Sequence, residues 1–204
     1  MSGEPVKRRY DATTRQAAAA RTRDQICAAA EELFVRDGYA RTSIKAVARA
    51  AGVSEATVYL AFEGKPGLLN AVILRAVQDD EAESIDTVLS GSAADVIPRL
   101  ARSNALTMER AAHVIALGEG AALMDAELRG MQARAHARLL ASWARVAERL
   151  DEAGLLADDA ETAARTIFAV SSETAYLRMT DDVGLSVDAY AAWLETTLAR
   201  LLLR

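Results

Sequence analysis

The chain has 204 residues and a formal net charge of −5; 51% of its residues are hydrophobic and only 5% are aromatic. This length can bury a core, and an apolar fraction rich in alanine and leucine favours helices over strands. No stretch reaches the roughly 18 uninterrupted apolar residues of a membrane helix, and Ala17–Ala20 is flanked by arginines rather than forming a signal core. We therefore expect an all-α, cytoplasmic protein without a membrane contact.

The acidic overall charge hides a basic N-terminal third. Residues 1–70 carry eleven Lys/Arg against eight Asp/Glu, a net charge of +3, whereas residues 71–204 carry thirteen against twenty-one, a net charge of −8. Positive charge is thus concentrated in the part of the chain that could meet a nucleic-acid backbone.

Residues 1–14 are polar and show no helical period, so we expect a flexible basic arm. Basic residues in the first 23 positions outnumber Glu4 and Asp11 by four; they are Lys7, Arg8, Arg9, Arg15, Arg21 and Arg23. Two interpretations remain open: an arm that follows the DNA backbone or minor groove, and a solvated tail.

The first helix is expected from about Arg15 to Asp37. Its apolar residues recur with helical spacing at Ile26, Ala29, Ala30, Leu33 and Phe34. Gly38 should end it, because glycine readily takes the left-handed conformation that follows many helices.

Two short helices should follow, the first capped by Thr42 or Ser43 and the second by Ser54. Three residues, Ala51-Gly52-Val53, separate them, and a short connector with a central glycine is typical of a helix-turn-helix. Pro66 stands where a first helical residue tolerates proline, and opens a longer helix.

Beyond residue 75 the pattern is helix after helix, with breaks at Ser90–Ser92, Gly118–Gly120, Asp125, Gly154 and Asp181–Ser186. We count about nine helices in all. The predicted organisation is an arm (1–14), a three-helix domain with the helix-turn-helix (15–65) and a larger helical domain (66–204), with the junction inside the helix that starts at Pro66.

The segment from Thr42 to Lys65, TSIKAVARAAGVSEATVYLAFEGK, closely resembles the DNA-binding signature of the tetracycline-repressor (TetR) family. Phe34–Tyr39 before it and Leu68-Leu69 after it extend the resemblance over roughly residues 20–75. It implies an all-α regulator with a helix-turn-helix. The residues also have a physical interpretation, in which Ala48 permits a close crossing, Gly52 makes the turn, and Val53 and Val58 fill the space between helices.

The remaining side chains of the motif are expected to face DNA. In the family the matching threonine, tyrosine and lysine touch the backbone, which implies this role for Thr42, Tyr59 and Lys65. The alternatives are that Thr42 only caps a helix, Lys65 is only solvated, and Tyr59 lies in the core. The full predicted DNA-binding set is Thr42, Ser43, Lys45, Ser54, Glu55, Ala56, Thr57, Tyr59, Leu60 and Lys65.

Two positions depart from the family's pattern. Leu60-Ala61 stands where family members place His, Asn or Tyr, so a phosphate contact is in doubt there. Glu55 is acidic where a basic or small residue is usual; it either accepts a hydrogen bond from a cytosine amino group or is a surface residue at the helix start.

The resemblance also implies that a small-molecule effector binds in the C-terminal part. The candidate pocket residues are Leu106, Met108, His113, Leu117, Met124, Met131, His136, Trp143, Phe168 and Tyr176. Ordinary core packing is the alternative, since apolar residues at helical spacing are usual in a core. His113 and His136 are too far apart for a metal pair on one helix, so we expect no metal and no cofactor.

The last two helices, predicted at about Asp158–Leu177 and Val187–Leu203, carry more apolar surface than one subunit easily hides. In relatives this pair forms a four-helix bundle with its two-fold mate, which implies a homodimer. The predicted interface residues are Ile167, Val170, Tyr190, Trp193, Leu194 and Leu198.

We expect a transcriptional regulator that acts as a repressor. It would bind a palindromic double-stranded DNA operator and be released when an effector shifts the helix from Pro66 to about Leu89. An enzyme is not expected, because the sequence lacks a phosphate-binding loop, a metal motif and a nucleophile elbow, and no catalytic residue is assigned. A helical adaptor that contacts proteins without specific DNA binding is the alternative. The sequence leaves open the effector, the operator, the regulated genes and the sign of regulation.

Overall fold

The computed structural model describes residues 6–78 and 82–204, with side chains from Gln16 onward. Its regular elements are ten α-helices, a short 3-10 turn and a π-helical turn, so the all-α prediction is confirmed. None of the described helices has the length and apolarity to cross a lipid bilayer. The chain divides into two compact units at Val72/Ile73, which we describe separately.

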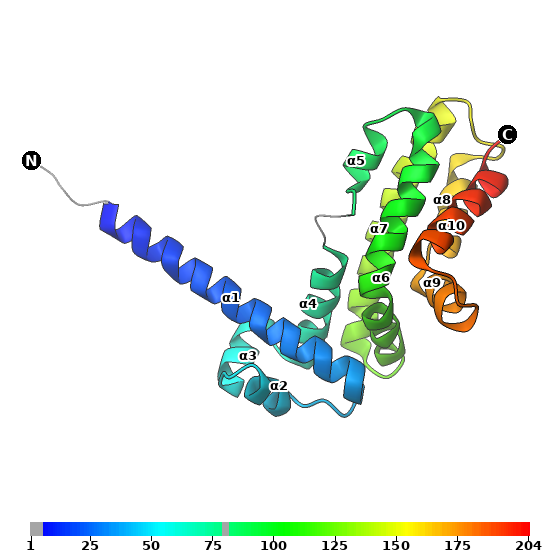
Figure 1. Ribbon diagram of the computed structural model, residues 1–204. Helices are drawn as coiled ribbons and strands as arrows, with labels where there is room; N and C mark the ends of the chain where they lie inside the picture. The colour runs from blue at the N-terminus through cyan, green and yellow to red at the C-terminus, as the bar shows by residue number, and fades with distance from the viewer. Residues whose placement is uncertain (1–5, 79–81) are drawn as a thin grey trace, which may run out of the picture. The chain divides into compact units, whose positions relative to one another are not determined.

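The N-terminal unit contains α1 (Val6–Asp37), α2 (Ile44–Ala50), α3 (Glu55–Phe62) and the first part of α4 (Lys65–Val77). Helices α2 and α3 lie against the C-terminal half of α1 (Figure 1). A small core holds these helices together; its buried side chains include Ile26, Phe34, Val47, Val58, Phe62, Leu68, Leu69 and Val72.

Helix α1 begins earlier than predicted. We expected a flexible arm to residue 14, but α1 starts at Val6, and only residues 1–5 of that arm lie outside the described residues. Residues 16–20, in the same N-terminal part of α1, are all exposed, and an exposed helical segment needs no apolar residues at helical spacing by which it could be predicted. Alanine, lysine and arginine are nevertheless strong helix formers, and extending a helix that the core has already nucleated adds one hydrogen bond per residue.

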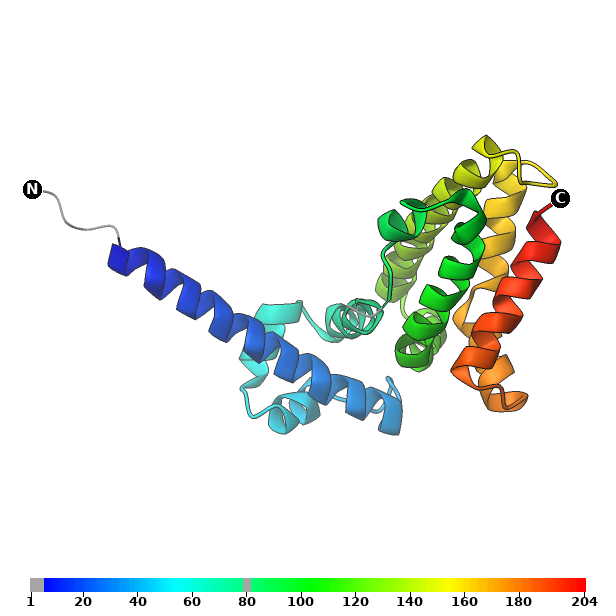
Figure 2. The ribbon, with the colours of Figure 1, turned by 45° about the horizontal axis from the view of Figure 1, so that its top comes forward.

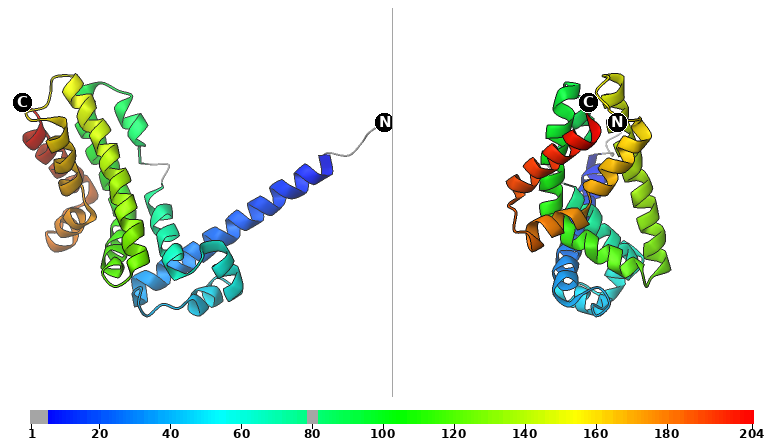
Figure 3. Two further views of the ribbon diagram at one scale, coloured as in Figure 1. Left: turned by 180° about the vertical axis from the view of Figure 1, so that it is seen from behind. Right: turned by 90° about the vertical axis from the view of Figure 1, so that its right-hand side faces the viewer.

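The C-terminal unit is a helical bundle. Its elements are the end of α4, then α5 (Ile85–Leu89), a 3-10 turn (Ala93–Asp95), α6 (Val96–Ala122), α7 (Ala126–Glu152), α8 (Ala160–Val170), α9 (Glu173–Leu177), a π-helical turn (Arg178–Asp182) and α10 (Val187–Leu202). Helix α6 packs against α7, α9 and α10, and α8 packs against α7 and α10 (Figures 2 and 3).

Three predicted boundaries in this unit were wrong. Helix α6 continues through Gly118 and Gly120, where a break was expected. The helix expected at Asp158–Leu177 is interrupted, because the Ser172 hydroxyl accepts the N–H of Ala175 and starts α9 anew. The helix expected from Pro66 to Leu89 is likewise two helices, with Ser84 capping α5. Serine competes well for the free N–H groups of a helix start, which makes it a restart signal.

Candidate nucleic-acid interface and effector region

The turn between α2 and α3 is built by local hydrogen bonds. The Ser43 hydroxyl caps α2 by accepting the N–H of Ala46 at 3.1 Å. Gly52 has φ of +67°, a conformation that disfavours any side chain, and the next N–H, of Val53, donates to the Ala48 carbonyl at 2.9 Å. Ala48 itself is buried, so the two short helices approach closely. This is a helix-turn-helix.

Helix α3 has one buried and one exposed face. Val58 and Phe62 point into the core of the N-terminal unit. On the opposite side the exposed residues are Glu55, Ala56, Tyr59 and Leu60. The two hydroxyls at the start of α3 are used locally, since Ser54 Oγ lies 2.8 Å from Thr57 Oγ1 and also accepts the N–H of Thr57. The fold thus gathers most of the predicted base-reading residues on one face, and their contact with DNA stays a prediction.

Thr42 does not lie on that surface. It is 3% exposed, and its hydroxyl donates to the carbonyl oxygens of Gly38 at 3.0 Å and Leu33 at 3.2 Å. The predicted phosphate contact of Thr42 was therefore wrong: its hydroxyl ties the end of α1 to the start of α2. Ser43 and Lys45, its predicted companions, are exposed.

Two cations link parts of the N-terminal unit that are distant in the sequence. The Lys65 ammonium lies 4.2 Å from the centre of the Tyr39 ring and donates to the Ala40 carbonyl at 3.3 Å. The Arg23 guanidinium lies 4.3 Å from the centre of the Phe62 ring and donates to the Ala61 carbonyl. Arg23 therefore fixes the C-terminal end of α3 to α1. From the sequence, Arg23 counts only among the basic residues of the first 23 positions, although it stands one turn before the buried Ile26.

Helix α3 itself carries no positive charge. Residues Glu55–Phe62 include no lysine or arginine, and Glu63 follows directly. Exposed cations of the unit lie outside α3, as with Arg41 in the loop before α2 and Lys45 and Arg49 on α2. Such an arrangement suits a helix that meets base edges while its neighbours meet phosphates.

The residues predicted for an effector pocket lie in different environments. Trp143 and Tyr176 are buried, whereas six others are half-buried: Leu106, Met108, Leu117, Met131, His136 and Phe168. Met124 is 91% exposed in the turn between α6 and α7, and His113 is exposed with its ring nitrogen 3.9 Å from the Asp181 carboxylate. These two predicted pocket residues were wrong, because both lie at the surface of the unit.

A buried polar chain crosses the C-terminal unit. Asn104 on α6 donates from Nδ2 to the Ser171 carbonyl at 3.0 Å and accepts the Tyr190 hydroxyl at 3.2 Å. The Tyr176 ring packs edge-on against Tyr190 with centroids 4.9 Å apart, and burial raises the pKa of both tyrosines. These hydrogen bonds are not predicted from the sequence, although Asn104 stands among apolar residues on the core face of α6.

A second polar cluster joins α6, α7 and α8. His136 Nε2 lies 3.0 Å from the Glu119 carboxylate, which also accepts from Gln132 Nε2. The His136 ring packs edge-on against Phe168 with centroids 5.5 Å apart. Among the described residues, two buried side-chain polar atoms make no hydrogen bond: Trp143 Nε1 and Ser171 Oγ.

Most of the predicted dimer-interface residues belong to the core of their own subunit. Ile167, Tyr190, Leu194 and Leu198 are fully buried in the single chain, so the prediction was wrong for these four. Helix α10 turns that face toward α6 and α8. Helical spacing reveals that a face is apolar but not which helix covers it. Val170 and Trp193 are half-buried.

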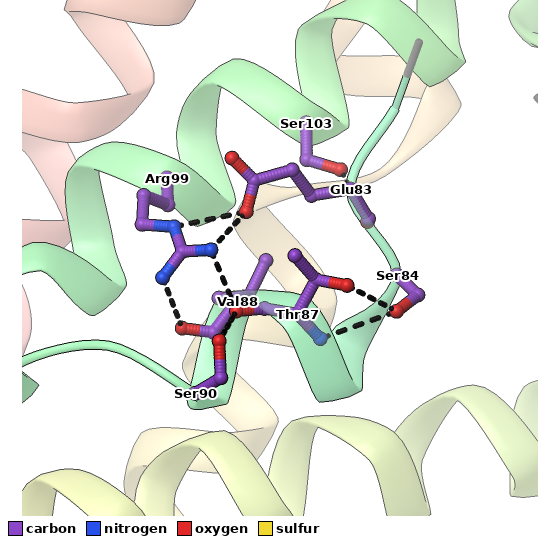
Figure 4. Close-up of polar contacts among 7 residues, drawn as sticks. All are labelled: Glu83, Ser84, Thr87, Val88, Ser90, Arg99 and Ser103. Carbon is purple, nitrogen blue, oxygen red and sulfur yellow. Dashed lines mark hydrogen bonds and ion pairs between the residues drawn. The ribbon is translucent and has the colours of Figure 1, made fainter. Parts of the chain in front are cut away.

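Arg99 on α6 clamps the segment before and within α5 (Figure 4). Its guanidinium donates to Glu83 Oε2 at 2.9 and 2.5 Å, to the Thr87 carbonyl at 2.6 Å and to the Val88 carbonyl at 3.4 Å. Nearby, the Ser103 hydroxyl donates to the Glu83 carbonyl at 2.8 Å. A cation on the carbonyl end of a short helix also complements its dipole.

Comparison with known proteins agrees with this geometry. Residues 26–72 match the model of the bacterial regulatory proteins of the tetR family. The crystal structure of NalD, the secondary repressor of the MexAB-OprM multidrug efflux pump in Pseudomonas aeruginosa, is similar with a TM-score of 0.69 and 24% identity, over 92% of this chain and 98% of that one.

Two further structures show the same fold. A SmeT–triclosan complex has a TM-score of 0.70 and 21% identity, over 90% of this chain and 92% of that one. A protein from Mesorhizobium loti described as a TetR-family transcriptional regulator has a TM-score of 0.66 and 26% identity, over 91% and 98%. Residues 26–72 thus match the tetR family model, and over most of its length the chain has the fold of these solved structures.

Proposed function

We propose that the chain is a cytoplasmic repressor that binds a palindromic operator as a homodimer and leaves it when a small molecule binds. The observation that carries the proposal is the exposed face of α3, held outward by the turn at Gly52 and by Arg23 at its end. A regulator must present such a face to read base edges in the major groove. The similarity to NalD, a repressor, supports the sign of regulation.

The phosphate contacts would come from the helices around α3. Lys45 and Arg49 on α2 and Lys65 at the start of α4 supply the charges, while Ser43 presents the start of α2. The proposed DNA-binding domain is 15–65, and 66–204 serves effector binding and dimerisation. Helix α4 continues without a break across the division between the two units, which supports a mechanical link along it.

The effector would bind among α6, α7 and α8. Trp143 Nε1 is a buried donor without a partner in the described part of the chain, and an unmet buried donor is best satisfied by a ligand or water. Met108 and Phe168 supply apolar surface in the same cluster. This combination favours an apolar effector with at least one hydrogen-bond acceptor. The SmeT–triclosan complex shows that this fold can hold a small molecule.

Two copies of the chain would pair through outward faces of α8 and α10, of which the half-buried Val170 and Trp193 remain candidates. A two-fold dimer can place its reading helices about 34–36 Å apart, so that they enter successive major grooves. That geometry makes the operator palindromic.

The test is a selection of duplexes from a random pool by the purified protein, followed by affinity measurements at several salt concentrations. We expect a palindromic consensus and a log–log salt slope of about −0.9 for each phosphate neutralised. A pool without enriched sequence, combined with salt-independent capture of a protein partner, would favour the adaptor instead. Light scattering of the free protein checks the dimer.

A further inference from the structure

Leu60 on α3 has little protein around it. It is 89% exposed, more than any other leucine among the described residues. Single exposed leucines are common on protein surfaces, so exposure alone means little. What distinguishes Leu60 is its position on the same exposed face as Glu55, Ala56 and Tyr59.

The chemistry of this face limits which bases it can read. Arginine and lysine, the usual readers of guanine, do not occur in α3. The hydroxyls of Ser54 and Thr57 already bond to each other and to the helix start. Glu55 can only accept hydrogen bonds while it is ionised, and Ala56 and Leu60 can neither donate nor accept from their side chains.

An apolar side chain in the major groove gains most from an apolar group on the DNA. The C5-methyl of thymine is such a group at the base edges there, and its contact with aliphatic side chains is a recognised means of reading thymine. Leu60 stands one turn after Ala56, which places the two side chains about 5–6 Å apart along the same face.

We infer that Leu60 reads a thymine methyl group and is a specificity-determining residue of this regulator. The inference rests on the proposed function and narrows it: each operator half-site contains a thymine at the base pair that meets the C-terminal half of α3. The contact is purely apolar, so it adds sequence preference without adding salt dependence.

The experiment uses the duplex selected by the wild-type protein. Each thymine is replaced in turn by deoxyuridine, which removes the methyl group and keeps the base pairing. We expect one thymine in each half-site whose replacement lowers the affinity about fourfold, the effect of exposing one methyl-sized group. Leu60→Ala should bind the thymine duplex more weakly and bind the thymine and uracil duplexes equally.

Two control variants accompany Leu60→Ala. Leu123→Ala truncates a leucine that is also largely exposed, in the turn after α6, and should keep the full preference for thymine. Leu60→Met keeps an apolar side chain of similar size and should retain most of the preference. A thermal melt of Leu60→Ala matching that of the wild type confirms that the variant folds, as its exposure implies.

Wild-type affinity that is the same for thymine and uracil at every position would overturn the inference while leaving operator binding intact. Equal loss by Leu60→Ala on both duplexes would also overturn it, because the side chain would then touch the sugar and not the methyl group. A selection that enriches no duplex would instead refute the proposed function itself.

Discussion

Replacing Asn104 with alanine tests the buried polar chain of the C-terminal unit. Asn104 is 7% exposed and bonds the Ser171 carbonyl and the Tyr190 hydroxyl. The change leaves both groups buried without this partner, and an unmet buried polar group costs about 1–3 kcal/mol. We therefore expect the free energy of unfolding to fall by about 2–6 kcal/mol. For a chain of this size that is a drop of at least about 4 °C in Tm.

Urea denaturation followed by circular dichroism measures the loss, and a double-mutant cycle assigns it. Tyr190→Phe removes the hydroxyl that donates to Asn104 Oδ1. In the double variant neither member of that bond remains, so the combined loss should be smaller than the sum by about 0.5–3 kcal/mol. Arg102→Ala, an exposed neighbour on α6, should change stability by less than about 0.5 kcal/mol. Strict additivity, or a loss below about 1 kcal/mol for Asn104→Ala, would refute the hydrogen-bonded chain.

Three further predictions concern the DNA-binding unit and the buried tyrosine. Thr42→Ala should lower Tm without changing the salt slope of DNA binding, whereas Lys65→Ala should reduce that slope by the amount expected for about one phosphate contact. The reverse result would show that Thr42 contacts the DNA backbone. A Cβ added at Gly67 would overlap the Phe62 carbonyl, so Gly67→Ala should abolish gel retardation by displacing the end of α3, while Gly120→Ala, with open space around its Cβ, should not. Burial raises the pKa of Tyr190 above its ordinary value of about 10, so the folded state favours the neutral phenol: stability should be intact below about pH 10 and decline above it as only the unfolded state ionises, and Tyr190→Phe should flatten that decline in urea titrations.

The features that could be predicted from sequence are those determined within a few residues. The positive φ at Gly52 and the caps at Ser43 and Ser54 follow from local steric and hydrogen-bonding rules, and the structure has each of them. The helix-turn-helix can therefore be predicted from its own residues.

The features that escaped prediction depend on partners distant in the sequence. Tyr190 and Leu194 show an apolar period, but the period does not distinguish a core shared with α6 from an interface shared with another copy. Thr42 could cap a helix or bond backward, and the choice is set by the packing of the end of α1. The hydrogen bond of Asn104 could not be predicted, because the carbonyl that accepts it belongs to Ser171, 67 residues away in the sequence.

Helix α5 depends on its contacts with Arg99. Five residues are far too few for a helix to persist alone in water, so α5 relies on its serine cap, the packing of Val88 and the guanidinium on its last carbonyls. An event in the bundle that draws Arg99 away would free the Glu83 carboxylate and the last carbonyls of α5, and would make unfolding of α5 easier. Since an extended residue spans more than twice the rise of a helical one, the segment that connects α4 and α6 could then span a longer distance. The Arg99 side chain is thus one of the contacts that determine the length of this connection.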